Sequence, residues 1–209
     1  MPLDIIIADD HSVVRDGLRQ LLQLNENYRV LATATSSEEL LEQCRRRLPD
    51  LIIVDLSMPG MGGVEGIRRL LIKWPSLVIT VFSIYKNPRL VKRIIEMGCK
   101  GFITKSSESD IIINGIQALA SGEQFISPDI EINFEINTSY STDTLSPKEF
   151  EIFRYITEGF GIKEISDKLF LSEKTIANNI SIIKNKLNAS SITDLVHIAI
   201  QEGLLVTDF

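Results

Sequence analysis

Five times within the first 122 residues, a short apolar segment with strand character is followed by a segment whose apolar residues have helical spacing. Residues 51–54 read LIIV, and residues 63–74 read GVEGIRRLLIKW, with apolar residues three and four positions apart. Strands that are apolar on both faces are typical of parallel sheets, because helices then cover both faces. The alternation therefore predicts an α/β fold for residues 1–122, with a five-stranded, doubly wound parallel sheet.

The last third of the chain has only helical patterns. Ser146 and Glu149, with a proline between them, form a capping-box sequence that begins a helix. Four short helical segments follow one another in residues 145–209, which predicts a compact all-α domain. Within it, residues 162–187 place a short helix, a tight turn and a longer helix in succession, which is the spacing of a helix-turn-helix.

Residues 123–144 lie between these two parts and contain five acidic residues and no Lys or Arg. Their polar, proline-containing ends indicate an acidic linker. Alternating apolar positions inside the segment are also typical of a short edge strand, which leaves both interpretations open. The alternating residues are Ile130, Ile132, Phe134 and Ile136.

The composition narrows the class of protein. With 44% hydrophobic and 24% charged residues, the chain is typical of globular proteins. It has no apolar stretch of roughly 18 residues and begins without the basic region of a secretory signal, so we expect a cytoplasmic protein with no membrane partner. Cys44 and Cys99 lack metal-ligand or redox spacing and are expected to be free, buried thiols. The net charge of −6 by itself does not indicate a nucleic-acid partner.

Polar residues end the predicted strands, and we refer to them together as the strand-end cluster. In parallel α/β sheets, ligands bind at the carboxyl ends of the strands, so these side chains should converge. Carboxylates that converge repel one another unless a cation lies between them, and oxygen ligands suit Mg²⁺. The strand-end cluster consists of Asp9, Asp10, Asp55, Ser83 and Lys105.

The chemistry expected of this cluster is phosphoryl transfer to Asp55. Mg²⁺ would neutralise charge on the incoming phosphate oxygens, Lys105 could pair with them, and Ser83 could donate a hydrogen bond. A phosphohydrolase of the haloacid-dehalogenase type is disfavoured, because that chemistry needs a second acid where Ser57 stands. His11 is expected to be an exposed loop residue, since no second His or Cys accompanies it as a metal ligand.

The first 122 residues resemble the receiver domain of two-component response regulators, a flavodoxin-like fold. The resemblance rests on ADD at 8–10, VDLSMPGMGG at 54–63, FS at 82–83 and GFITK at 101–105. It implies that Asp55 is the phosphoacceptor and that Lys105 pairs with the phosphate. It also implies a Mg²⁺ site made by Asp9, Asp10, Asp55 and the main-chain carbonyl of Ser57, with Ser83 and Phe102 as coupled switch residues. The chain departs from the pattern at Gly62, where many members carry Asp or Asn, and at Ser106, where many carry Pro.

Residues 145–199 resemble the LuxR-type domain of the NarL/FixJ class of response regulators. Matching positions include Leu145, Glu149, Gly159, Ser172 and Thr175. The recognition helix departs from the family at Ala177, Asn179 and Ser181, where cationic or histidine side chains are common, and fewer cations weaken contacts to phosphate. The residues expected to contact DNA are Lys174, Thr175, Asn178, Asn179, Lys184 and Lys186.

Together the two resemblances imply a response regulator whose phosphorylation at Asp55 controls DNA binding and transcription. A sensor histidine kinase, a phosphotransfer protein or a small acyl phosphate would supply the phosphoryl group. The protein would promote only its own phosphoryl transfer and dephosphorylation, with Phe102 turning inward as Ser83 approaches the phosphate. The active form would be a homodimer on double-stranded promoter DNA. In the alternative interpretation, the helical domain binds a protein and contacts DNA weakly or not at all.

Overall fold

The computed structural model describes residues 2–130, 141–202 and 204. The chain divides into two compact units, Met1–Glu131 and Ile132–Phe209, which are described separately below. Within the described residues, no helix combines the length and the apolar character that crossing a membrane requires.

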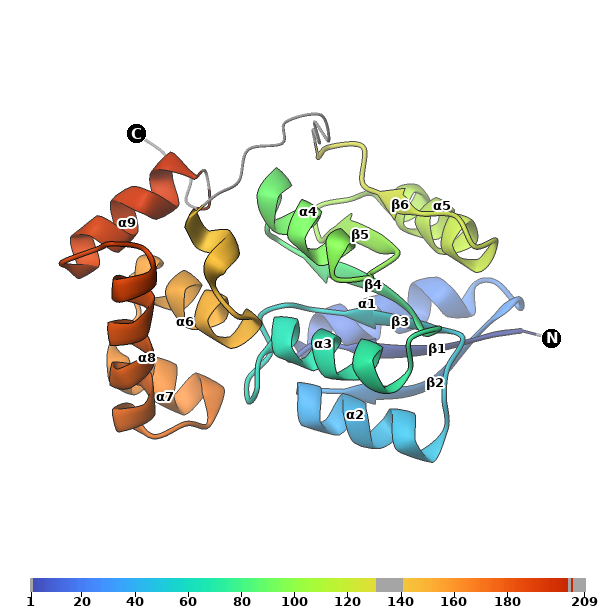
Figure 1. The fold of residues 1–209 in the computed structure, drawn as a ribbon. Coiled ribbons are helices and arrows are strands. Elements are labelled where there is room, and N and C mark those ends of the chain that lie inside the picture. Colours follow the sequence, from blue (N-terminus) through green and yellow to red (C-terminus); the bar gives the residue numbers. More distant parts are fainter. Residues whose placement is uncertain (1, 131–140, 203, 205–209) are drawn as a thin grey trace. The chain divides into compact units, whose positions relative to one another are not determined.

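The first unit is a parallel β-sheet with helices on both faces (Figure 1). The strand order is β2-β1-β3-β4-β5-β6, and every neighbouring pair is parallel. The elements are β1 Leu3–Ala8, α1 Ser12–Gln23, β2 Tyr28–Ala34, α2 Ser37–Arg46, β3 Leu51–Val54, α3 Gly63–Lys73, β4 Val78–Ser83, α4 Pro88–Glu96, β5 Gly101–Thr104, α5 Ser109–Ala120 and β6 Phe125–Ile126.

The predicted α/β fold with a parallel sheet is confirmed, but the predicted number of strands is wrong. The sheet has a sixth strand, β6, which lies in the segment that the sequence indicated as a linker. Phe125 N donates to Lys100 O (3.1 Å), and Ser127 N donates to Phe102 O (2.9 Å). A strand of two residues is too short to show alternation in a sequence. Ile130 is buried, whereas the other three positions of the suggested edge strand lie outside the described residues.

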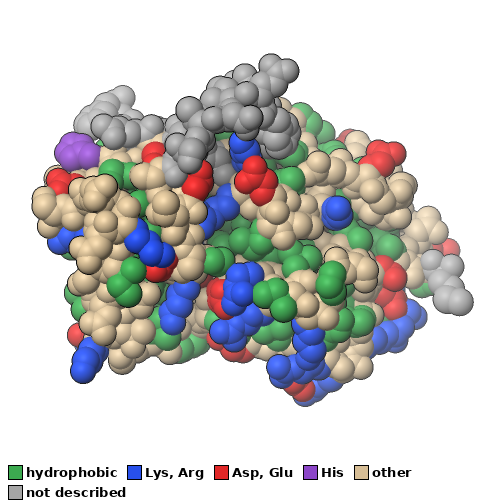
Figure 2. All heavy atoms as spheres, viewed as in Figure 1, with side chains coloured by type: hydrophobic (Ala, Val, Ile, Leu, Met, Phe, Trp, Pro, Cys, Tyr) green, Lys and Arg blue, Asp and Glu red, His purple; other side chains and the backbone are tan. Residues whose placement is uncertain are grey.

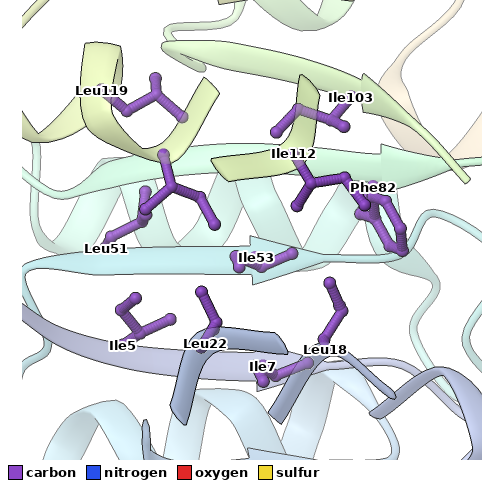
Figure 3. Close-up of a cluster of buried hydrophobic side chains, with 11 residues drawn as sticks. Ile5, Ile7, Leu18, Leu22, Leu51, Ile53, Phe82, Ile103, Ile112 and Leu119 are labelled. Carbon is purple, nitrogen blue, oxygen red and sulfur yellow. The ribbon is translucent and has the colours of Figure 1, made fainter. Parts of the chain in front are cut away.

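One core of the first unit lies between the sheet and helices α1 and α5 (Figure 3). It forms because alternate residues of a strand point to the same face, so that Ile5 and Ile7 of β1 meet Leu18 and Leu22 of α1. The intervening residues, such as Ile6, point to the opposite face, which α2, α3 and α4 cover (Figure 1). The remaining buried residues of the α1–α5 core are Leu51, Ile53, Phe82, Ile103, Ile112, Ile116 and Leu119.

The two cysteines are free and buried, as predicted. Burial raises the pKa of the Cys44 thiol to about 11 and that of Cys99 to about 12, because an apolar environment disfavours the thiolate. Both side chains therefore act as small apolar residues of the core.

Charged side chains of both signs lie side by side over α2 and α3 (Figure 2). Arg46 Nε is 3.3 Å from Glu42 Oε1 on α2, and Arg68 Nε is 2.8 Å from Glu65 Oε2 on α3.

The second unit is helical. A 3₁₀ turn, Ser141–Thr144, precedes four α-helices in the described part of this unit: α6 Pro147–Thr157, α7 Ile162–Leu169, α8 Glu173–Lys186 and α9 Ile192–Gln201. The predicted capping box is present: Ser146 N donates to Glu149 Oε2 (2.7 Å), and Glu149 N donates to Ser146 Oγ (3.3 Å). The Ser172 side chain caps α8 by accepting from Thr175 N at 3.1 Å. The predicted helix-turn-helix therefore consists of α7 and α8.

An ion pair joins the end of α8 to the start of α6. Lys186 Nζ is 2.7 Å from Glu149 Oε2 and donates to the carbonyl oxygen of Thr144 at 3.2 Å. Burial raises the pKa of the Glu149 carboxyl, but Lys186 and the hydrogen bonds from Ser146 outweigh it and hold the pKa below 4.5. Ionised Glu149 therefore stabilises the folded state above the pKa that the unfolded chain has, and this contribution is lost as the pH falls through the folded-state pKa.

We expect Glu149→Gln to lower the free energy of unfolding by about 1–2 kcal/mol near neutral pH, because it removes charge-assisted hydrogen bonds. The difference between the two proteins should vanish in acid, where Glu149 is protonated in both states. Urea unfolding over a pH series measures it. Asp167→Asn, on the exposed surface of α7, is the matched control and should change stability by less than about 0.5 kcal/mol. A loss that persists in acid would contradict the role of the charge.

Candidate functional site

The parallel sheet brings the strand-end cluster to one edge. Asp9 and Asp55 directly follow the neighbouring strands β1 and β3, and their main-chain N–H groups continue the sheet hydrogen bonds, to Ala34 O (3.0 Å) and Ala8 O (2.8 Å). Lys105 follows β5, and its N–H donates to Ser83 O at 2.8 Å. The predicted convergence at the carboxyl ends of the strands is present.

A single ammonium group joins the two buried acids of the cluster. Lys105 Nζ is 2.7 Å from Asp9 Oδ2 and 3.0 Å from Asp55 Oδ2, and both acids are 2% exposed. Asp10 lies beside them and is more exposed. The pocket therefore contains three carboxylates and one lysine, which contacts two of them, and this leaves an excess of negative charge.

The pKa values reflect this arrangement. Burial raises the pKa of the Asp55 carboxyl above its ordinary value; Asp9 raises it further, while Lys105 and the N–H of Ser57 oppose the shift. Burial alone would lower the pKa of Lys105, but its contacts with Asp9 and Asp55 outweigh burial and raise it. The charged form of Lys105 is therefore stabilised, whereas burial destabilises the charged form of the Asp55 carboxyl.

The residues fit a divalent cation. Asp9, Asp10, His11 and Asp55 each offer one ligand atom, and these atoms all lie within 4.8 Å of one another. Asp9 Oδ2 and Asp55 Oδ2 are buried, and Lys105 Nζ faces both of them. Oxygen donors with this excess of negative charge suit Mg²⁺. Ser57, two residues after Asp55, has a buried hydroxyl with no hydrogen-bond partner within the described chain.

Ser83 and Phe102 are both fully buried. Ser83 ends β4, and its Oγ accepts a hydrogen bond from Tyr85 N (3.3 Å). Phe102 lies on β5 opposite Val81 of β4. The ring of Phe102 is inside the protein in the state that the structure describes.

The loop between β3 and α3, which follows Asp55, is held by residues that the sequence analysis did not single out. Ser37 Oγ donates to Gly62 O (2.9 Å), and Glu38 Oε1 accepts from Met61 N (2.7 Å). In the sequence, Ser37 and Glu38 indicated only the start of a helix. Gly62 has φ +83° and ψ 159°, a backbone conformation that is essentially limited to glycine.

The segment after β6 is also tied to the strand ends. Ser127 Oγ accepts from Thr104 N (3.0 Å), and Thr104 Oγ1 is 3.0 Å from Asp129 Oδ2. Lys86, in the loop after β4, has its Nζ 2.8 Å from Asp129 Oδ2. No local sequence pattern indicates these contacts, because they join segments far apart in the chain.

The exposed face of α8 is polar and carries little charge. Its residues lie four, three and four positions apart, opposite the buried residues Ile176, Ile180 and Ile183. We call them the α8 outer face: Lys174, Asn178, Ser181 and Asn185.

The other residues expected to contact DNA lie off this face. Asn179 Nδ2 donates to the main-chain oxygen of Thr175 at 2.8 Å, and the Thr175 hydroxyl pairs with Ser172 Oγ at 2.8 Å. Lys184 is half-buried. Lys186 is turned to Glu149, and the sequence could not reveal this pairing because the two residues are far apart along the chain.

Two family models match the chain, one for each unit. Residues 5–117 match the response regulator receiver domain, and residues 143–199 match the luxR family of bacterial regulatory proteins. The chain is a response regulator of the LuxR family. Its second unit is accordingly a LuxR-type DNA-binding domain, and the response regulator acts in transcription regulation.

Known response regulators are similar to this one over nearly the full length. The transcriptional regulatory protein YdfI of Bacillus subtilis is 33% identical, and the match covers 98% of each chain. A structure of the RcsB response regulator of Salmonella typhimurium is 28% identical with a TM-score of 0.72, covering 96% of this chain and 98% of that one. A structure of RcsB from Salmonella enterica serovar Typhimurium, bound to a promoter in the presence of the phosphomimetic BeF3−, is 28% identical with a TM-score of 0.62 and covers 95% of this chain and 98% of that one.

Proposed function

We propose that Asp55 accepts a phosphoryl group and that this modification controls binding of promoter DNA by the second unit. The observation that supports the proposal is the contact of Lys105 with the two buried carboxylates, Asp9 and Asp55, at the strand ends. The donor is a phosphohistidine of a sensor kinase or phosphotransfer protein, or a small acyl phosphate. An Asp55 oxygen attacks phosphorus, and the bond to the leaving nitrogen or oxygen breaks, its electrons leaving with the donor.

Asp9, Asp10, Asp55 and the main-chain carbonyl of Ser57 are the proposed ligands of Mg²⁺, which when bound neutralises charge on the transferring phosphoryl group. Lys105 pairs with a phosphoryl oxygen in place of its present contact with Asp55. The negative charge of the three acids repels an anionic phosphate when no cation is bound. A cation would therefore have to bind before the phosphoryl group is transferred.

Ser83 and Phe102 are the proposed switch. The Ser83 hydroxyl accepts from Tyr85 N, so its own proton is available to a phosphoryl oxygen. Because Phe102 is already buried, the switch is a repacking inside the core as Ser83 moves, and it shifts a pre-existing equilibrium between two packings.

Double-stranded promoter DNA is the proposed partner of the second unit, with α8 in the major groove. The structure of RcsB on a promoter supports this assignment by similarity. Asn178, on the α8 outer face, has the geometry to read adenine through its amide. Lys186 reaches phosphate only in competition with Glu149. The proposed contacts are Lys174, Thr175, Asn178, Asn179, Lys184 and Lys186.

We further propose that the active form is a homodimer in the cytoplasm, promoting no reaction except its own phosphorylation and dephosphorylation. In functional terms, the chain is proposed to divide into a receiver (1–122), a linker (123–144) and a DNA-binding domain (145–209), with the first residues of the linker added to the sheet as β6.

The salt dependence of binding to promoter fragments tests the DNA-binding proposal. Each phosphate contact releases condensed counterions, so Lys174→Ala should make the slope of log K against log salt shallower by about 1. Lys100→Ala removes the same charge from an exposed position in the first unit and should leave the slope unchanged. If the phosphorylated protein binds no DNA even at low salt, the alternative of a protein-binding output is favoured.

A further inference from the structure

His11 lies against the proposed cation pocket. Its Nδ1 is 2.9 Å from Asp10 Oδ1 and 3.2 Å from Asp9 Oδ1. We propose that His11 is an additional ligand, so that the pocket accepts first-row transition-metal dications, such as Ni²⁺ and Mn²⁺, through an imidazole nitrogen. This inference rests on the proposed function, because it concerns the same pocket.

The distances match the spacing of neighbouring metal ligands. Bonds of about 2.1 Å at right angles place two ligand atoms about 3.0 Å apart. The His11 nitrogen lies at that spacing from two carboxylate oxygens at once. His11 precedes α1 at the N-cap position, yet its side chain makes no capping hydrogen bond, so the ring is turned to the acids and not to the helix.

The pocket has two sides with different chemistry. Lys105 contacts the Oδ2 atoms of Asp9 and Asp55, and His11 contacts the Oδ1 atoms of Asp9 and Asp10. Lys105 does not block the Oδ1 side.

A nitrogen ligand changes which ions bind best. Carboxylate and carbonyl oxygens suit Mg²⁺, whereas imidazole favours transition metals, and the affinity of such sites rises from Mn²⁺ to Ni²⁺. A pocket with His11 should therefore discriminate between Ni²⁺ and Mg²⁺ more strongly than the same pocket without it. His11 has no His or Cys companion in the sequence that would mark it as a metal ligand, but its companions in the structure are carboxylates.

The test uses the full chain without a histidine tag. The chain has only two histidines, and His197 is exposed on α9, so His197→Gln is the matched control for His11→Gln. Electron spin echo spectroscopy of bound Mn²⁺, with isotopically labelled histidine, should show nitrogen coupling in the wild type and in His197→Gln. The coupling should be absent in His11→Gln. Calorimetry should show the ratio of Ni²⁺ to Mg²⁺ affinity falling about tenfold in His11→Gln alone.

Bound Mn²⁺ without nitrogen coupling, or equal losses of Ni²⁺ and Mg²⁺ affinity in His11→Gln, would overturn the inference. If Asp55 is still phosphorylated with Mg²⁺ in that case, the proposed function stands and only the role of His11 fails. If the wild type binds neither ion, the cation pocket itself is refuted, and the inference falls with it.

Discussion

Replacing Asp55 with Asn will abolish phosphorylation by acetyl phosphate, with labelling below detection. Asparagine has nearly the same shape, so the loop after β3 keeps its hydrogen bonds, but its amide is not a nucleophile for phosphorus. Intact-protein mass spectrometry should show one added phosphoryl group per wild-type chain in the presence of Mg²⁺ and none in the variant.

Asp16→Asn is the matched control for this experiment. Asp16 is an exposed acid on α1 in the same unit, and its replacement should leave the labelling unchanged. Circular dichroism of both variants checks that the fold persists. Label retained by the Asp55 variant, mapped by peptide analysis to another residue, would disprove the assignment of the phosphoacceptor.

Lys105→Ala is expected to have the largest effect on stability. Removing one partner of a buried ion pair leaves an uncompensated charge, which costs about 3–5 kcal/mol. Here two acids, each 2% exposed, lose the cation that they share. Urea unfolding in the absence of divalent ions, followed through Trp74, the single tryptophan, measures the loss in the first unit.

Mg²⁺ should restore much of the stability of Lys105→Ala, because an ion that binds only the folded state stabilises it by about 2.7 kcal/mol at one hundred times its Kd. Lys100→Ala, an exposed lysine of the same unit, should lose less than about 0.5 kcal/mol and respond to Mg²⁺ as the wild type does. A small loss in Lys105→Ala without metal would show that the two acids do not depend on this lysine.

The contribution of Lys105 to the free energy of unfolding changes with pH in a direction that its pKa shift determines. The pKa of Lys105 is raised in the folded state, so its contribution is present below the unfolded-state value of 10.5 and is lost as the pH rises through the folded-state pKa. The pKa of Asp55 is also raised, so stability from this group declines as the pH rises above 3.8. The wild type should therefore resist mild alkali, and Lys105→Ala should gain stability in mild acid as Asp55 becomes protonated.

The sequence was informative where local pattern and sheet geometry act together. Apolar runs predicted the strands, and Asp9, Asp55 and Lys105 could be brought to one edge because parallel strands end on the same side. Ser146 and Glu149 predicted the start of α6, since a capping box depends only on residues three apart.

Contacts between distant segments were not predictable in this way. The ion pair between Lys186 and Glu149 depends on how α8 packs on α6. The hydrogen bond from Met61 N to Glu38 Oε1 depends on how α2 lies beside the loop after β3. β6 was missed because its two residues contain only a single period of alternation, which is too little to show a pattern. His11 is exposed and lies before α1, as predicted, and its contacts with the acids next to it in the chain form a pattern without a metal-site signature.

The short strand β6 has a consequence for how a signal leaves the first unit. Ser127 is hydrogen-bonded to the main chain of Phe102 and Thr104, and Asp129 is held by Lys86 from the loop that follows Ser83. The chain that leaves the sheet is thus hydrogen-bonded to β5 and paired with the loop after Ser83, two and four residues after β6 begins at Phe125. If Ser83 and Phe102 act as the proposed switch, a displacement of either residue would reach this segment through these contacts.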